Sequence, residues 1–255
     1  MGARNELEER YRSVTQRVGE AAARVGRKAS DIVVVAVTKT AGPDQIRQLI
    51  EMGHGDLGEN RVQHLQQRVA MAEEFLSRRR LVVGANKSGA ASQVRWHMIG
   101  HLQRNKVRIV LPLVKLIHSI DSLRLAEEIQ AHAARLDQDA DVLLQVNISG
   151  EAAKSGLAPA AAPHLAEQMQ SMAHVRVRGL MTMAPYAQDP EASRETFQRC
   201  AELFEEMRSS GRAGERFNIL SMGMSNDFEV AIESGANLVR IGRALFGEPQ
   251  AGDGD

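Results

Sequence analysis

A lysine at the end of an apolar run is the first residue in this chain whose type and position suggest chemistry. Residues 32–37 are uninterrupted apolar and mostly β-branched, and Lys39 follows between two threonines. Such a run is typical of a strand buried on both faces in a parallel sheet. The lysine is either a solvated loop residue or a partly desolvated amine, whose lowered pKa makes it a nucleophile that forms Schiff bases. The run alone leaves both interpretations open.

The segment 221–225 has the residue types of an anion site. Ser221 and Ser225 can donate hydroxyl hydrogens, and Gly223 between them allows backbone N–H groups to approach a ligand closely. We expect this segment to leave a strand and enter a helix, with Ser225 placed to cap the helix. An ordinary serine N-cap would account for the same residues, so the segment predicts a phosphate site only in combination with others.

A cation and a second flexible position follow at 240–243. Gly242-Arg243 offers a backbone approach and a positive charge, and Arg240 is expected to point into the site, where a ring nitrogen or a phosphate would be its partner. An amine and a phosphate site on one rim suggest pyridoxal phosphate, whose aldehyde is held on a lysine while the protein tunes the ring. An arginine facing the pyridine nitrogen would discourage its protonation and weaken the electron sink.

Eight strand-like segments alternate with helical segments and must position these residues. This alternation predicts a single (β/α)8 TIM-type barrel with an extra N-terminal helix, whose apolar stripe starts at Leu7. A doubly wound open sheet is the alternative, but no glycine-rich dinucleotide fingerprint follows the first strand. The strands are expected at 32–37, 54–57, 94–99, 116–119, 141–148, 175–181, 217–220 and 238–241.

The barrel is expected to occupy residues 1–247 as one domain. Within it, residues 81–93 carry small residues and glycines without a helical period, which predicts an inserted loop. Residues 248–255 are expected to form a disordered tail. Because the βα loops form the active face of such a barrel, the residues at the strand ends should share one rim.

Composition excludes several classes of function. The chain has 32 basic and 32 acidic residues and few aromatic ones, which argues against binding to nucleic acid or to a membrane surface. Cys200 is the single cysteine, so an internal disulfide and a cysteine metal cluster are excluded.

His97 and His101 have a spacing that binds metal on a helix, but we expect a strand followed by a loop there, and therefore no metal site. The N-terminus is too charged for a signal peptide, and no apolar run approaches a membrane span, so we expect a cytoplasmic protein.

Six sequence blocks, in order along nearly the whole chain, resemble one known family. The blocks VAVTKT, GDLGENRVQ, WHMIGHLQRNK, LLQVNISGEAAKSGL, RGLMTM and LSMGMSNDFEVAIESGANLVRIGRALFG are similar to those of the pyridoxal phosphate homeostasis protein family. That family is a single-domain version of the alanine racemase barrel. Its members are carriers or regulators of cellular vitamin B6 without established catalytic turnover. At position 243 this chain has Arg, where the family usually has a small hydroxyl residue.

The resemblance implies a role for each site residue. It makes Lys39 the residue that holds pyridoxal 5'-phosphate as a Schiff base, and it places Asn60 and Arg240 beside the ring. The residues that it places around the phosphate are Ser221, Met222, Ser225 and Gly242. We further expect pyridoxal-phosphate-dependent apo-enzymes as candidate recipients of the cofactor, although the sequence itself does not identify the recipient, and we expect a monomer.

Two enzymatic alternatives remain open at this point. A racemase of this barrel type uses a lysine and a tyrosine from a second, all-β domain. We expect too few residues after Gly247 for such a domain, although Tyr186 lies in a loop expected on the active face. An aldolase that uses a lysine needs carboxylates nearby for acid–base catalysis, and Asp121 is only a weak candidate for this role. We therefore favour a binding protein over a racemase, and a racemase over an aldolase.

Overall fold

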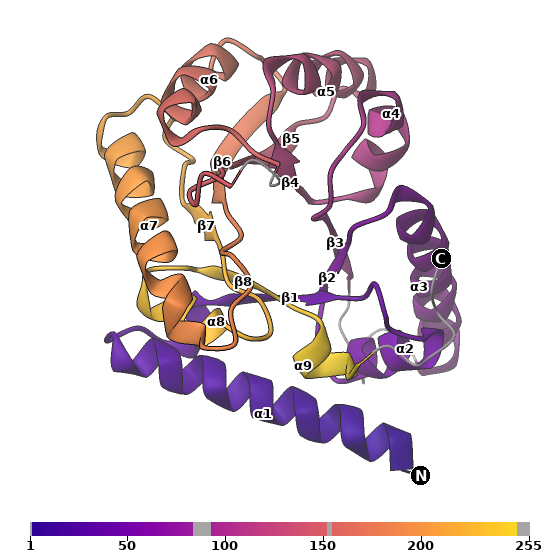
Figure 1. Ribbon diagram of the computed structural model, residues 1–255. Helices are drawn as coiled ribbons and strands as arrows, with labels where there is room; N and C mark the ends of the chain where they lie inside the picture. Colours follow the sequence, from indigo (N-terminus) through magenta and orange to yellow (C-terminus); the bar gives the residue numbers. More distant parts are fainter. Residues whose placement is uncertain (1, 84–92, 152–154, 249–255) are drawn as a thin grey trace.

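Eight parallel strands close into a barrel in which each strand pairs with its neighbours in sequence and β8 pairs with β1 (Figure 1). The computed structural model describes residues 2–83, 93–151 and 155–248. The predicted barrel and its N-terminal helix are therefore confirmed. The strands are Val33–Val37 (β1), Asp56–Glu59 (β2), Arg95–Met98 (β3), Leu116–Ile120 (β4), Ala140–Gln145 (β5), Val175–Met181 (β6), Ile219–Ser221 (β7) and Leu238–Ile241 (β8).

Helices cover the outside of the barrel, and short 3-10 helices join several of them to the strands. The α-helices are Gly2–Arg24 (α1), Pro43–Glu51 (α2), Val62–Val83 (α3), Val107–Val110 (α4), Leu123–Leu136 (α5), Ala162–Met169 (α6), Arg194–Ser209 (α7), Phe228–Glu233 (α8) and Arg243–Phe246 (α9). The 3-10 helices are Ala29–Asp31 (η1), Arg104–Lys106 (η2), Leu111–Leu113 (η3), Pro159–Ala161 (η4) and Pro190–Ser193 (η5). In the described ranges, no helix is long and apolar enough to cross a membrane.

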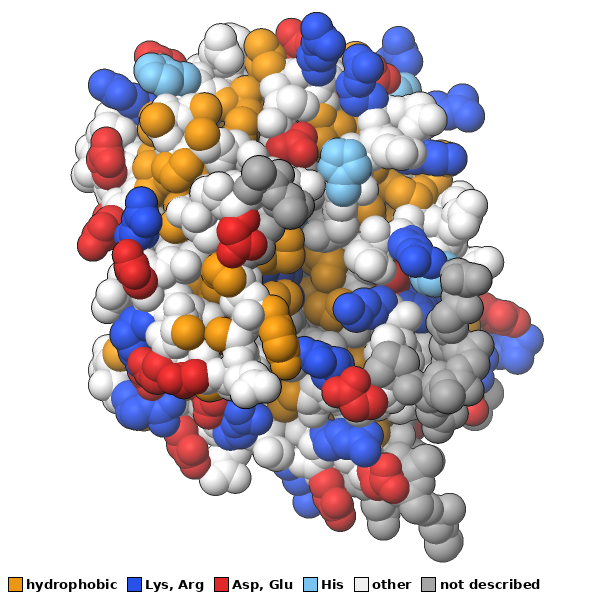
Figure 2. Space-filling view, in the orientation of Figure 1, with side chains coloured by type: hydrophobic (Ala, Val, Ile, Leu, Met, Phe, Trp, Pro, Cys, Tyr) orange, Lys and Arg blue, Asp and Glu red, His pale blue; other side chains and the backbone are white. Residues whose placement is uncertain are grey.

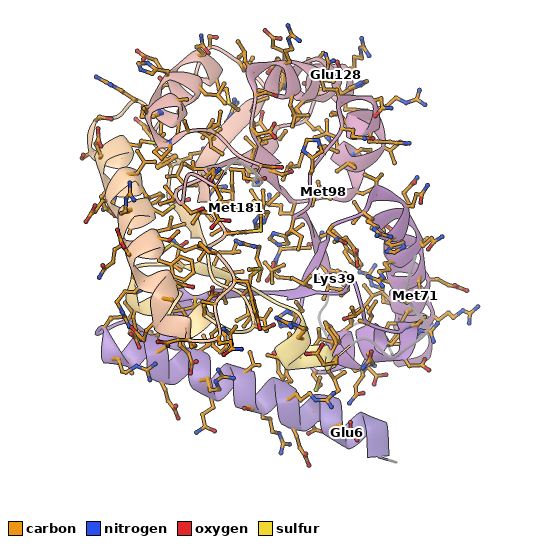
Figure 3. The ribbon with its side chains drawn as sticks, viewed as in Figure 1. Glu6, Lys39, Met71, Met98, Glu128 and Met181 are labelled. Carbon is orange, nitrogen blue, oxygen red and sulfur yellow. The ribbon has the colours of Figure 1, made fainter. Side chains whose placement is uncertain are left out.

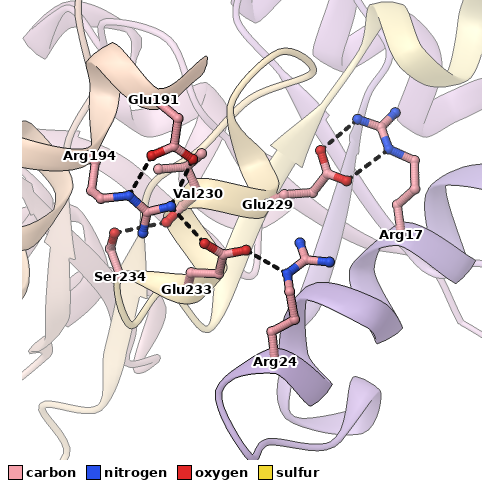
Figure 4. A network of polar contacts seen from close by, with 8 residues as sticks. All are labelled: Arg17, Arg24, Glu191, Arg194, Glu229, Val230, Glu233 and Ser234. Carbon is pink, nitrogen blue, oxygen red and sulfur yellow. Dashed lines mark hydrogen bonds and ion pairs between the residues drawn. The ribbon is translucent and has the colours of Figure 1, made fainter. Parts of the chain in front are cut away.

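The extra helix α1 lies across the outside of the barrel and packs on α8 and α9 (Figure 1). Its predicted stripe faces this contact, since Leu7, Val14 and Val18 are buried. Ion pairs border the apolar contact: Arg17 binds Glu229 through two hydrogen bonds, and Arg24 and Arg194 share Glu233 (Figure 4). The helix is thus an integral part of the fold.

Strand residues alternate between two apolar cores. One set packs outward under the helices, and Trp96, Met98, Val239 and Ile241 belong to it. The other set fills the barrel interior with Val35, Leu116, Leu143, Met181 and Leu238. Because successive strand side chains point to opposite faces, residues between outward ones point inward. The same alternation puts four buried polar residues inside the barrel, namely His97, His118, Ser221 and Arg240.

Three expectations about local structure need correction. Helix α3 continues to Val83, so residues 81–83 are helical and not part of an inserted loop; residues 84–92 lie outside the described residues. Strand β2 includes Gly58 and Glu59, because Ile99 N–H donates to Glu59 O and keeps this segment in the sheet. The alternation of strands and helices predicts one helix from about residue 102 after β3, but the structure divides this segment into η2, α4 and η3, the last containing Pro112. The predicted tail lies outside the described residues beyond Glu248.

Candidate functional site

Lys39 lies at the rim formed by the carboxyl ends of the strands. Thr38 N–H donates to Gly58 O at 3.0 Å, and a Cβ on Gly242 would lie 3.4 Å from Val37 O, so the end of β1 is held between the ends of β2 and β8. Figure 3 shows Lys39 near the end of β1, toward the middle of the barrel, whereas Glu6, Met71 and Glu128 lie on the surrounding helices. The lysine side chain is exposed, so the partial desolvation that the sequence suggests is not seen.

A buried ion pair holds the turn that carries Lys39. Glu59 is completely buried and accepts hydrogen bonds from Thr38 Oγ1 and Arg68 Nη1. Arg68 also donates from Nη2 to Ala41 O at 3.2 Å. The turn is therefore held on both sides of Lys39, through the Thr38 side chain before it and the Ala41 carbonyl after it. Glu59 was missed by sequence reasoning, because nothing near it shows that Arg68 in α3 reaches it.

Ser225 and Gly242 come together as predicted, but the serine caps a different helix. Ser225 Oγ accepts from the backbone N–H groups of Gly242 and Ala244, each at 3.2 Å, and so lies at the start of α9. The cap residue of α8 is Asp227, whose Oδ1 accepts from Met224 N–H at 2.7 Å. The expectation that Ser225 caps the helix after β7 is wrong, because α8 begins two residues later than that position requires.

Gly223 is required by packing between the loop and α8. Its φ is +91°, and a Cβ there would lie 2.5 Å from Ala231 Cβ. Its carbonyl accepts from Arg240 N–H, which ties the loop to β8. Met222, next to it, is completely buried in the outer core, and its N–H donates to Leu238 O. Neither the side chain nor the N–H of Met222 is thus directed at the rim, and its phosphate contact stays a prediction.

Two further predicted positions lie on the surface of the rim. Asn60 follows β2 and is exposed, and its backbone is so close to Gly100 that a Cβ on that glycine would lie 2.2 Å from Asn60 O. Arg243 is exposed and pairs with Glu248 at 3.7 Å. The structure therefore brings Asn60 to the same end of the barrel as Lys39, and it directs the Arg243 charge to a neighbouring carboxylate.

Arg240 is a buried cation inside the barrel, below the rim. Its Nη1 donates to Ser221 Oγ at 2.6 Å and its Nη2 donates to Thr182 O at 2.9 Å. Burial lowers the pKa of Arg240 to about 10, so the guanidinium remains charged at neutral pH. Both of these acceptors are uncharged, and Ser221 is completely buried. The phosphate contact expected for Ser221 is untested and stays a prediction, while its contact with Arg240 is plain.

Two histidines continue inward from Ser221. His118 Nδ1 lies 3.1 Å from Ser221 Oγ, and its Nε2 lies 3.0 Å from His97 Nδ1. His97 Nε2 lies 3.2 Å from Asp56 Oδ1, at the opposite end of the barrel from the rim. Burial lowers the pKa of His118 well below its usual value, and the nearby His97 and Arg240 lower it further, so His118 is neutral. Sequence reasoning missed His118 and Asp56.

The residues set aside in the sequence analysis have ordinary surroundings. In the ranges that the structure describes, no group of three potential ligands could hold a metal ion. His101 is exposed and lies 3.6 Å from Asp121, whereas His97 is inside the barrel, so the two histidines share no face. Tyr186 is 77% exposed in the loop after β6.

The face in Figure 2 is hollowed over the middle of the barrel, with hydrophobic side chains in the hollow and basic ones beside it.

Comparisons with known proteins identify the family and the fold of this chain. The family model described as alanine racemase, N-terminal domain, matches residues 12–250. A pyridoxal phosphate homeostasis protein from Aquifex aeolicus is 39% identical over 94% of this chain and 97% of its own. The structure of PipY from Synechococcus elongatus with pyridoxal phosphate bound is 27% identical, with a TM-score of 0.72 over 92% of this chain and 100% of that chain.

A more distant likeness shows the fold alone. Alanine racemase from Clostridium difficile is 15% identical, with a TM-score of 0.65 over 98% of this chain and 57% of the racemase. The match to the family model and the relative at 39% identity extend over nearly the whole chain. The chain belongs to the pyridoxal phosphate homeostasis protein family, within the larger group built on the N-terminal domain of alanine racemase.

Proposed function

We propose that this chain binds pyridoxal 5'-phosphate as a Schiff base on Lys39 and acts in vitamin B6 homeostasis as a carrier or buffer without turnover. The observation that carries the proposal is the position of Lys39 on the same rim as the Ser225–Gly242 cluster, above the buried Arg240. The name of the Aquifex aeolicus relative and the cofactor bound to PipY support it.

The groups at this rim match the chemistry of the cofactor. The Lys39 amine condenses with an aldehyde to an imine and releases one water. Ser225 Oγ accepts from two backbone N–H groups, so its own hydrogen is available to donate to a phosphate oxygen. Arg240 stays charged and would face the ring nitrogen, which keeps that nitrogen unprotonated. The bound cofactor would supply an electron sink, and this arrangement weakens it.

Titration with pyridoxal 5'-phosphate, followed by visible absorption, tests the proposal. The wild-type chain is expected to develop the absorption of a Schiff base, and Lys39→Ala is expected to lose it while its far-ultraviolet circular dichroism is unchanged. Lys115→Ala is the matched control, because Lys115 is an exposed lysine that lies before β4, at the opposite end of the barrel. Retention of the full signal in Lys39→Ala would contradict the assignment.

The absence of turnover is a separate part of the proposal. We expect no interconversion of D- and L-alanine by the loaded protein. Racemisation that is lost in Tyr186→Phe would replace this part of the proposal by the racemase alternative, since Tyr186 is an exposed residue of the β6 loop. Transfer to apo-enzymes and the monomeric state remain predictions.

A further inference from the structure

Four consecutive hydrogen bonds cross the barrel interior from Asp56 to Arg240. They join Asp56 to His97, His97 to His118, His118 to Ser221, and Ser221 to Arg240, at 3.2, 3.0, 3.1 and 2.6 Å. Strands β2, β3, β4, β7 and β8 each contribute one residue. This series of hydrogen bonds, called the histidine chain below, begins at the end of the barrel opposite the rim and ends at the Arg240 guanidinium below Lys39.

The charges at the two ends, together with one proton on each imidazole, give every hydrogen bond between them one direction. Hydrogen bonds from His97 and Arg95 outweigh the effect of burial and hold the pKa of Asp56 below its usual value, so this carboxylate only accepts. His97 therefore donates from Nε2, and with a single proton on its ring it accepts at Nδ1 from His118 Nε2–H. Neutral His118 then accepts at Nδ1 from the Ser221 hydroxyl, whose oxygen accepts from Arg240. Both histidines are Nε2–H tautomers in this arrangement.

Other charged and titratable groups lie near the two ends of the histidine chain. Asp56 also binds Arg95 at the solvent side, and His54 lies near both Asp56 and His97. Asp227 and Cys200 are near Arg240, and burial raises the pKa of the Cys200 thiol to about 12, so it is neutral. Inside the barrel, the hydrogen-bonded series thus ends in one anion, Asp56, and one cation, Arg240. A reversed chain would need an added proton on the histidine pair, and two donors would then converge on Ser221.

We propose that Asp56, His97 and His118 are positioning residues for Arg240, which transmit the orientation set by the Asp56 carboxylate through the barrel to the ligand rim. Replacement of the carboxylate by an amide, which can donate as well as accept, removes the constraint that selects one tautomer of His97, and hence of His118. Ser221 then becomes a weaker acceptor for Arg240, and the guanidinium is held less firmly. The inference about the ligand rests on the proposed function, whereas the order of the hydrogen bonds does not.

The matched variants are Asp56→Asn and Asp141→Asn. Asp141 lies at the same end of the barrel in β5, its side chain is 14% exposed against 16% for Asp56, and it likewise binds an arginine, Arg178 at 2.7 Å. Asp141 has no place in the histidine chain. Both substitutions therefore remove a mostly buried carboxylate that is paired with an arginine, and they differ in whether the carboxylate is connected to Arg240.

The first measurement uses nitrogen-15 NMR of the histidine side chains in the protein without added ligand. We expect both His97 and His118 to be Nε2–H tautomers in the wild-type chain and in Asp141→Asn. In Asp56→Asn, the shifts of the two ring nitrogens of each histidine should approach each other, as the preference for one tautomer is lost. An Nδ1–H tautomer of His118 in the wild-type chain, or unchanged shifts in Asp56→Asn, would overturn the proposal.

The second measurement is the dissociation constant for pyridoxal 5'-phosphate. We expect Asp56→Asn to bind about tenfold more weakly than the wild-type chain and Asp141→Asn to bind equally well. Equal affinities of the two variants, with binding by the wild-type chain, would contradict the positioning role. If the wild-type protein does not bind the cofactor at all, the proposed function fails. The NMR result still decides the directions of the hydrogen bonds between Asp56 and Arg240.

Discussion

At the scale of single residues, Lys39 owes its position to groups that are distant in sequence. Its own strand supplies the height along the barrel, but the Glu59–Arg68 pair fixes the turn around it. The apolar run before Lys39 is visible in the sequence, and it was enough to predict a lysine at a strand end. The contribution of Glu59 could not be predicted, because a carboxylate after a short strand is usually solvated.

The contribution of the Glu59–Arg68 ion pair to the free energy of unfolding can be measured by removing the arginine. Arg68→Met leaves the fully buried Glu59 without its charged partner, so we expect a loss of about 3–5 kcal/mol in the free energy of unfolding. Arg78→Met is the matched control in the same helix: the Arg78–Glu74 pair is exposed, and its loss should cost less than about 1 kcal/mol. Urea unfolding measures both, and equal losses would show that Glu59 does not depend on Arg68.

Ser221 and Ser225 show how far residue types alone can lead. Both are serines in one short segment, and both were expected at the phosphate. In the structure, Ser225 caps the start of α9, whereas Ser221 forms hydrogen bonds with Arg240 and His118. The partners of Ser221 are 19 and 103 positions away in sequence, so only the closed barrel brings them together.

At the scale of elements, the loop after β7 depends on how closely it packs on α8. The sequence suggests that Gly223 serves a ligand, but its conformation and its contact with Ala231 are sufficient reasons for a glycine. The loop in turn accepts the N–H of Arg240, so its packing helps to set the height of β8. This connection between a helix contact and the site is a property of the assembled elements.

Gly223→Ala tests this packing. The new Cβ would lie 2.5 Å from Ala231 Cβ at a φ of +91°, and we expect a loss of about 3 kcal/mol or more in the free energy of unfolding. Gly214→Ala separates the two causes, because Gly214 has a φ of +83° with open space around its Cβ position. It should lose only about 1–2 kcal/mol. Equal losses would mean that the backbone conformation, and not the contact, requires Gly223.

At the scale of the whole molecule, the alternation of strands and helices was sufficient to predict a closed barrel. All eight strands lie at or next to their expected positions, because most of them are apolar segments bounded by polar residues. The exceptions are informative: β2 includes the polar Glu59, and α3 runs on through residues expected in a loop. A buried carboxylate and a helix continued by apolar residues both depend on tertiary partners, which periodicity does not show.

The barrel interior is where sequence reasoning reached least. Asp56, His97 and His118 come from three different strands, and each is unremarkable within its own segment. Their connection exists only once β2, β3 and β4 lie side by side and β7 and β8 close the ring. The position of Lys39 at the rim was predictable because barrels of this type place their strand ends together, whereas the interior contacts depend on which side chains meet across the closed barrel.

The most direct test of the account is to trap the cofactor where it binds. The protein is incubated with pyridoxal 5'-phosphate, reduced with borohydride, digested and mapped by mass spectrometry. We predict one modified peptide, with the reduced pyridoxyl group on Lys39, and no modification in the Lys39→Ala variant. A group found on Lys115 or another lysine, or no stable adduct at all, would contradict the claim that this rim holds the cofactor through Lys39.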